Sequence, residues 1–179
     1  MRDSLKSRIM KRSGRTLKQR LYGLKHLSSR LRRARYFRGH GVHSPYIYNI
    51  VRQVFMCSKL KSSEHPLYDA LMAAGVAKRR AVQLQNLVTH CDYDNWAINE
   101  LREVKFIVAT VDIVPSELAK YATFAQEHGI TLCIMSPYYT AERWEVSSGI
   151  IDAHPSTTVD NRAYLLIFNN HLPLQRFRL

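Results

Sequence analysis

The chain has 179 residues, 46% of them hydrophobic, which suffices for one domain with a substantial core and is short for two. It contains no apolar run near the roughly 18 residues of a membrane span, and no apolar signal segment follows its basic start. Three widely spaced cysteines (Cys57, Cys91 and Cys133) form no CxxC pair, so we predict buried free thiols in a reducing cytoplasm rather than a metal site.

The net positive charge of the chain comes from its first residues. Residues 1–40 carry 14 lysines or arginines against the single acid Asp3, whereas residues 41–179 carry 13 bases and 13 acids. We therefore predict a basic arm over residues 1–38 and an α/β domain over residues 39–179. A strongly cationic arm favours polyanions such as RNA, DNA or an anionic membrane surface, and a solubilising tail without a specific partner is the alternative.

The arm divides into two stretches. Residues 1–15 show no periodicity and are expected to lack regular structure. From Thr16 onward the sequence predicts a basic amphipathic helix. Its apolar stripe consists of leucines at spacings of three and four, namely Leu17, Leu21, Leu24, Leu27 and Leu31. Such a helix can lie on a membrane, bind a nucleic-acid backbone, or pack its leucines on its own domain.

Two helices are expected after the arm. Ser44 and Pro45 are typical of an N-cap and a first helical residue, and they predict a helix over 46–55. A second helix is expected over 67–74, and Gly75 after it would supply a left-handed C-cap.

The next stretch predicts the first strands. Val82 and Leu84 alternate with glutamines, which indicates a strand over 79–85, with a loop or short helix over 86–91. A short strand is expected over 96–98. Continuous apolar runs then predict buried parallel strands. These are residues 105–111 and 130–135, joined by a helix over 117–128 that Pro115 opens.

The C-terminal part predicts the closure of the sheet. A helix is expected over 141–153, and strands over 157–160 and 163–168. A turn at 169–171 would then return the chain as a last strand over 172–179, forming an antiparallel hairpin. The predicted fold class is therefore α/β, a Rossmann-like, mostly parallel sheet closed by a C-terminal antiparallel hairpin and preceded by N-terminal helices.

Two stretches of the sequence are similar to a known family. The segment Gly39-His40-Gly41-Val42-His43-Ser44-Pro45-Tyr46 resembles the N-terminal signature of a bacterial family of class I S-adenosylmethionine-dependent methyltransferase-like proteins. Residues from about 104 to 179 resemble the end of the same family, whose sheet closes with an antiparallel hairpin. This second stretch includes Ser136-Pro137-Tyr138-Tyr139, His154-Pro155 and Thr158-Val159-Asp160. The middle of the chain does not match.

The resemblance implies an S-adenosylmethionine site and names residues for it. His40, His43 and Tyr46 would border the cofactor pocket, and Glu100 or Asp112 would supply the acid. Each residue type also has a purely structural interpretation. The histidines can bond nearby backbone, and Asp112 can cap the helix that Pro115 opens. Tyr138 and Tyr139 follow a strand where open α/β sheets bind ligands, but they fit an aromatic core equally well.

The middle of the chain lacks the expected cofactor-binding pattern. Class I methyltransferases bind the cofactor at a glycine-rich turn after the first strand, with an acid at the end of the second. No glycine lies between Gly75 and Gly129, and the predicted first strand runs into the side chains of residues 84–90. Glu100 fits the role of the ribose acid only if residues 96–99 form the second strand. Poor cofactor affinity is therefore expected.

Three functions are consistent with these observations. The first is a degenerate methyltransferase-like domain that binds no cofactor and serves as a non-catalytic binding or structural module. The second is a small active S-adenosylmethionine-dependent methyltransferase with a divergent cofactor site. The third is a nucleic-acid-associated protein that acts through its basic arm.

Overall fold

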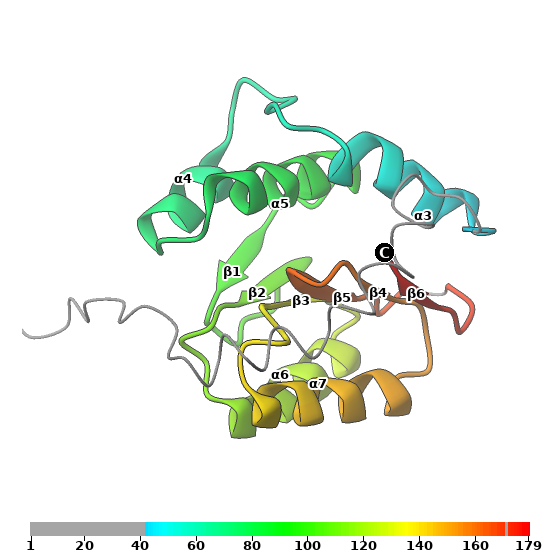
Figure 1. The fold of residues 1–179 in the computed structure, drawn as a ribbon. Coiled ribbons are helices and arrows are strands. Elements are labelled where there is room, and N and C mark those ends of the chain that lie inside the picture. The colour runs from blue at the N-terminus through cyan, green and yellow to red at the C-terminus, as the bar shows by residue number, and fades with distance from the viewer. Residues whose placement is uncertain (1–41, 171) are drawn as a thin grey trace, which may run out of the picture.

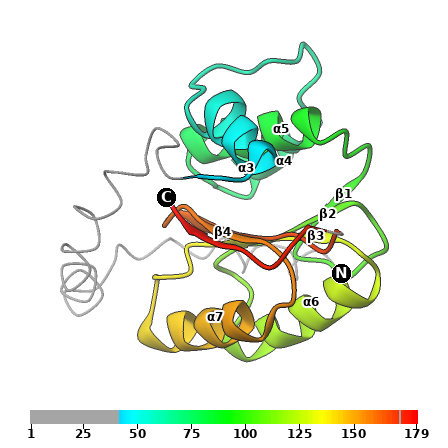
Figure 2. The ribbon, with the colours of Figure 1, turned by 90° about the vertical axis from the view of Figure 1, so that its right-hand side faces the viewer.

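The computed structural model describes residues 42–170 and 172–179. The basic arm, its predicted amphipathic helix and His40 lie outside the described residues. One sheet lies between two helical layers (Figures 1 and 2). Among the described residues, no helix combines the length and apolar character needed to cross a bilayer.

The helical layers are built from six elements. On one face of the sheet lie α3 (Pro45–Ile50), the π-helical turn η1 (Val51–Phe55), α4 (Pro66–Ala73) and α5 (Lys78–His90). On the other face lie α6 (Pro115–Glu127) and α7 (Ala141–Ala153). A separate hydrophobic core fills the space on each side of the sheet.

The sheet has six strands in the order β1-β2-β3-β5-β4-β6. They are β1 (Trp96–Ile98), β2 (Phe106–Ala109), β3 (Thr131–Met135), β4 (Thr158–Asp160), β5 (Tyr164–Ile167) and β6 (Arg176–Arg178). Strand β5 is antiparallel to both of its neighbours, and every other pairing is parallel. The predicted fold class is therefore confirmed.

The predicted pairing of the last strand was wrong. Strand β6 covers only three residues and pairs parallel with β4, whereas the antiparallel hairpin joins β4 and β5. Strands β3 and β4 already occupy both sides of β5, so the chain after the hairpin cannot pair with β5 and is added at the free edge of β4. Side chains at the start of β4 fix this path, because Ser156 Oγ donates to the carbonyl of Leu172 at 2.9 Å and Thr157 Oγ1 to that of Pro173 at 2.7 Å.

The predicted first strand over 79–85 was also wrong, since these residues lie in helix α5. The buried apolar residues Ala81, Leu84, Leu87 and Val88 recur at helical spacing, whereas the alternation of Val82 and Leu84 with glutamines is local.

The amide side chains of α5 are buried instead of facing water, and each has a tertiary role. Gln83 Nε2 donates to the carbonyl of Phe55 at 2.7 Å, and Asn86 Nδ2 donates to that of Lys59 at 2.9 Å. Gln85 Oε1 accepts from the backbone N–H of Tyr68 at 3.1 Å. These bonds attach η1, the connector after it, and α4 to one helix, which explains why polar residues tolerate burial there.

Most of the other predicted elements are confirmed. The helix expected over 46–55 is α3 continued by η1, and Ser44 caps it by accepting a bond from the N–H of Ile47 at 3.4 Å. Gly75 follows α4 with the predicted left-handed backbone, φ +72°. The βαβ unit β2-α6-β3 is parallel as predicted, and α7 has the predicted bounds.

Candidate functional site

The carboxyl ends of β1 to β4 meet at one edge of the sheet, the edge at which open α/β sheets bind ligands. Three of the residues that follow these strands have left-handed backbones although none is glycine. They are Asn99 after β1 (φ +56°), Ser136 after β3 (φ +48°) and Arg162 after β4 (φ +69°). Such conformations are disfavoured and concentrate at functional sites, so this edge is the first candidate.

At the ends of β1 and β2, polar side chains bond mainly to each other. Asn99 Oδ1 accepts from the N–H of Thr110 at 2.7 Å, and Asn99 Nδ2 donates to Thr110 Oγ1 at 2.8 Å. The Thr110 hydroxyl in turn donates to Asp112 Oδ2 at 2.9 Å. Because Asn99 and Thr110 use their hydrogen-bonding capacity on one another, this network holds two strand ends together and leaves few free donors for a ligand.

A buried arginine ties together the ends of β2 and β3. Arg143 of α7 is only 2% exposed, and its guanidinium donates to three backbone carbonyls. Nη1 bonds to Ile113 at 2.7 Å, Nη2 to Thr110 at 2.8 Å and Nε to Met135 at 3.2 Å. Burial lowers the pKa of Arg143, and the charge of Asp112 partly offsets this. The guanidinium therefore occupies space at this edge and stabilises the loop that leads to α6.

Arg143 was not identified from the sequence, although its position on the buried stripe of a predicted helix could have indicated it. The buried positions of α7 are Arg143, Ser147 and Ile151, spaced by four residues. A charged residue on that stripe is not recognised as buried from sequence, because arginine is rarely buried unless it has partners. Here the partners are loop carbonyls, which a sequence does not reveal.

Aromatic side chains cover the end of β3. The ring of Tyr138 stacks on Trp144 of α7, with ring centroids 4.2 Å apart and an angle of 17° between the planes. The Tyr138 hydroxyl donates to Asp160 Oδ2 at 2.5 Å, and Asp160 Oδ1 accepts from the N–H of Arg162 at 2.7 Å. Tyr138 thus links the ends of β3 and β4.

The structure does not bring the sequence-predicted site residues together. Glu100 and Asp112 are exposed and follow β1 and β2 at the carboxyl edge. Asp112 is not the helix cap, because the N-cap of α6 is Val114. His43 is exposed just before α3, so its side chain lies outside the cores.

Tyr46 lies at the opposite, amino edge of the parallel strands. Its hydroxyl is 3.4 Å from Cys91 Sγ, and its ring meets that of Phe168 edge-on at 5.7 Å. The neighbouring Tyr93 bonds to Thr131 Oγ1, at the start of β3, at 2.8 Å. Burial is the main cause that raises the pKa of Tyr46, which is therefore neutral and serves as packing.

The turn after the first strand is not where the sequence placed it. Residues 84–90 belong to α5, so their side chains cannot obstruct a cofactor turn as predicted. The first strand is β1, and its connection to the parallel strand β2 consists of residues 99–105 without a helix. This edge therefore lacks the helix N-terminus that receives a cofactor after the first strand of a Rossmann unit.

Comparisons with protein-family models, with curated proteins and with solved structures find no match to this chain. The described residues contain no group of three or more His, Cys, Asp or Glu side chains that could hold a metal ion. All three cysteines are unpaired, as predicted, but only Cys133 is fully buried.

Proposed function

We propose that this chain is a degenerate methyltransferase-like domain that serves as a non-catalytic binding or structural module. One observation carries the proposal, namely the connection between β1 and β2. It spans residues 99–105, contains no helix, and begins with Asn99 rather than glycine. A nucleoside cofactor in such a sheet depends on close backbone approach and on a helix N-terminus at this point.

The polar groups around the connection support the same proposal. Asn99 and Thr110 bond to each other, and Arg143 bonds to three loop carbonyls. A cofactor would have to break these bonds before forming its own, and each buried group left unpaired would cost about 1–3 kcal/mol. The polar groups at this edge therefore serve to hold the ends of β1, β2 and β3 together.

Calorimetric titration with S-adenosylmethionine and S-adenosylhomocysteine tests this proposal. We expect no saturable heat at concentrations up to about a millimolar, a range in which active enzymes of this kind bind substrates. Micromolar binding that weakens on Glu100→Gln or Asp112→Asn, but not on Glu142→Gln, would refute it and establish an active enzyme with a divergent site. Glu142 is a suitable control because it is exposed on α7.

A second candidate function rests on the charge of the arm. Residues 1–40 carry 14 of the 27 lysines and arginines, a composition that favours binding to a nucleic-acid backbone. The α/β domain would then position the arm.

The salt dependence of duplex DNA binding tests this second function. For the full chain we expect affinity to fall steeply with salt, and the triple variant Arg30→Gln, Arg32→Gln, Arg33→Gln to reduce the log–log slope by roughly three. The matched variant Arg52→Gln, Lys59→Gln, Lys61→Gln removes three exposed charges from the domain and should leave the slope unchanged. Equal effects of both variants would exclude a specific role of the arm.

A further inference from the structure

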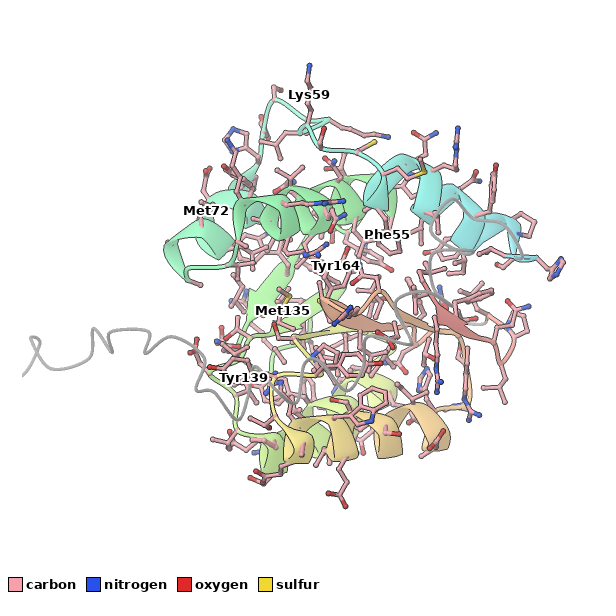
Figure 3. All side chains as sticks on the ribbon, in the orientation of Figure 1. Phe55, Lys59, Met72, Met135, Tyr139 and Tyr164 are labelled. Carbon is pink, nitrogen blue, oxygen red and sulfur yellow. The ribbon has the colours of Figure 1, made fainter. Side chains whose placement is uncertain are left out.

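A second feature of the carboxyl edge lies between the sheet and the layer of α3, η1 and α5. It is a cavity of about 190 Å³, lined by Val51, Phe55, Met56, Arg79, Arg80, Gln83, Asn161 and Leu179. Phe55 from η1 and Tyr164 from β5 point toward one another across the interlayer space (Figure 3), with ring centroids 5.9 Å apart. We propose that this cavity binds the phosphate group of a small molecule through Arg79 and Arg80.

The charged side chains among the lining residues are both arginines. Arg79 and Arg80 are adjacent, and no aspartate or glutamate is among the lining residues. In residues 42–170 and 172–179, neither arginine forms an ion pair with an acid. Burial is the main cause that lowers the pKa of Arg80; Tyr164 partly offsets it, and the neighbouring Arg79 makes the smallest contribution, which also lowers it. Arg80 is half-buried beside the exposed Arg79, and a bound dianion would offset the repulsion between the two guanidinium groups.

Hydrogen bonds hold Arg80, Gln83 and Asn161 in place before any ligand arrives, whereas Arg79 is exposed. Gln83 Oε1 accepts from Arg80 Nη1 at 2.8 Å and from the Tyr164 hydroxyl at 3.4 Å, while Gln83 Nε2 bonds to η1. Asn161 Oδ1 accepts from the N–H groups of Ala163 and Tyr164, both at 3.1 Å, and these bonds do not use its NH₂ donors. Ordering these side chains therefore costs little on binding, because the protein has already fixed them.

The start of α5 contributes to the same field. Arg79 and Arg80 lie in its first turn, which contains no acid, and its N-cap Ala77 offers no side-chain bond. The other long helices carry an acid there, Glu117 in α6 and Glu142 in α7. Cations at a helix N-terminus are unfavourable, whereas an anion is favoured. Two arginines at the start of α5 therefore lower the stability of the folded chain when the cavity is empty, and a bound anion would raise it.

The size and the apolar wall limit the ligand. The cavity of about 190 Å³ has room for a phosphate with a small organic group. Two guanidinium groups suit phosphate because their planar forks bind its oxygens in pairs. Val51, Phe55 and Met56 would contact the organic part. The inference is independent of the proposed function, since it uses neither the turn after β1 nor the arm.

The test uses the full chain and titrates inorganic phosphate and phenyl phosphate at constant ionic strength, measured by calorimetry. We expect saturable binding of both, with phenyl phosphate the tighter, and an affinity loss of about tenfold or more for Arg79→Gln and for Arg80→Gln. Arg79→Lys keeps the charge but not the planar fork and should lose less than Arg79→Gln. Lys78→Gln removes a charge from the same helical turn but outside the cavity lining and should bind as the native chain does.

Arg79→Gln decides the outcome if Arg80→Gln fails to fold, because Arg79 is exposed and does not support Gln83. The inference is overturned if Arg79→Gln binds phosphate as tightly as the native chain. It is also overturned if Lys78→Gln loses as much as Arg79→Gln, since the attraction would then come from overall charge and not from the cavity. A failure here would leave the S-adenosylmethionine titration unaffected.

Discussion

Replacing Arg143 by methionine is expected to lower the free energy of unfolding by about 3 kcal/mol or more. The side chain is 2% exposed and donates to the carbonyls of Thr110, Ile113 and Met135. Methionine fills much of the same space but donates no hydrogen bond, so the carbonyls of Ile113 and Met135 would lose this donor, and that of Thr110 would keep the N–H of Ile113 at 3.3 Å. Each buried carbonyl left unpaired costs about 1–3 kcal/mol. The variant no longer has to bury a charged guanidinium, but this gain offsets only part of the cost of the unpaired carbonyls.

Urea unfolding followed by circular dichroism measures this effect, with the change read from the midpoint at constant slope. Arg143→Lys should recover only part of the stability, because one ammonium group cannot reach three carbonyls at the ends of two strands. Glu145→Ala, an exposed change on the same helix, should stay within about 0.5 kcal/mol of the native chain. A loss below about 1 kcal/mol for Arg143→Met would show that the loop carbonyls find other partners.

The central sheet could be predicted because its signals are local. Strands β2 and β3 are continuous apolar runs buried on both faces, and α7 lies between the cap Thr140 and the breaking pair His154-Pro155. Helix α5 could not be predicted in this way, since Gln83, Gln85 and Asn86 are buried by bonds to residues 17–28 positions away. Such tertiary partners override the local alternation of polar and apolar residues.

The candidate site was harder to predict than the fold, and the reasons are physical. The left-handed turns at the carboxyl edge use Asn99, Ser136 and Arg162, so the absence of glycine concealed them. Arg79 and Arg80 were placed at the start of a predicted strand, whereas in a helix they line one cavity with residues more than 70 positions later. Tyr46 was expected beside Glu100 and Asp112, but it lies at the amino edge of the parallel strands, a position that depends on the strand order and directions in the sheet. Sequence spacing does not carry this information.

Raising the pH above 10 is expected to destabilise the chain strongly, because the buried Tyr164 and the partly buried Tyr46 and Tyr93 must stay protonated in the folded state. Burial is the main cause that raises the pKa of Tyr93 to about 12, and it raises the pKa values of Tyr46 and Tyr164 further. A raised folded pKa contributes stability that is fully present below the unfolded value of about 10 and is lost as pH rises toward the folded value. Burial shifts the thiol pKa of Cys133 in the same direction.

For Tyr93 alone, a rise of the pKa to about 12 corresponds to a loss of a few kcal/mol at complete titration, and the other two phenols add to it. Urea unfolding at pH 8 and pH 11.5 measures the difference, and absorbance at 295 nm follows phenolate formation. Tyr93→Phe loses the bond to Thr131 at both pH values, so its stability should depend less on pH than that of the native chain. Equal stability of the native chain at the two pH values would contradict the burial of these hydroxyls, and with it the packing of α3 and α5 on the sheet.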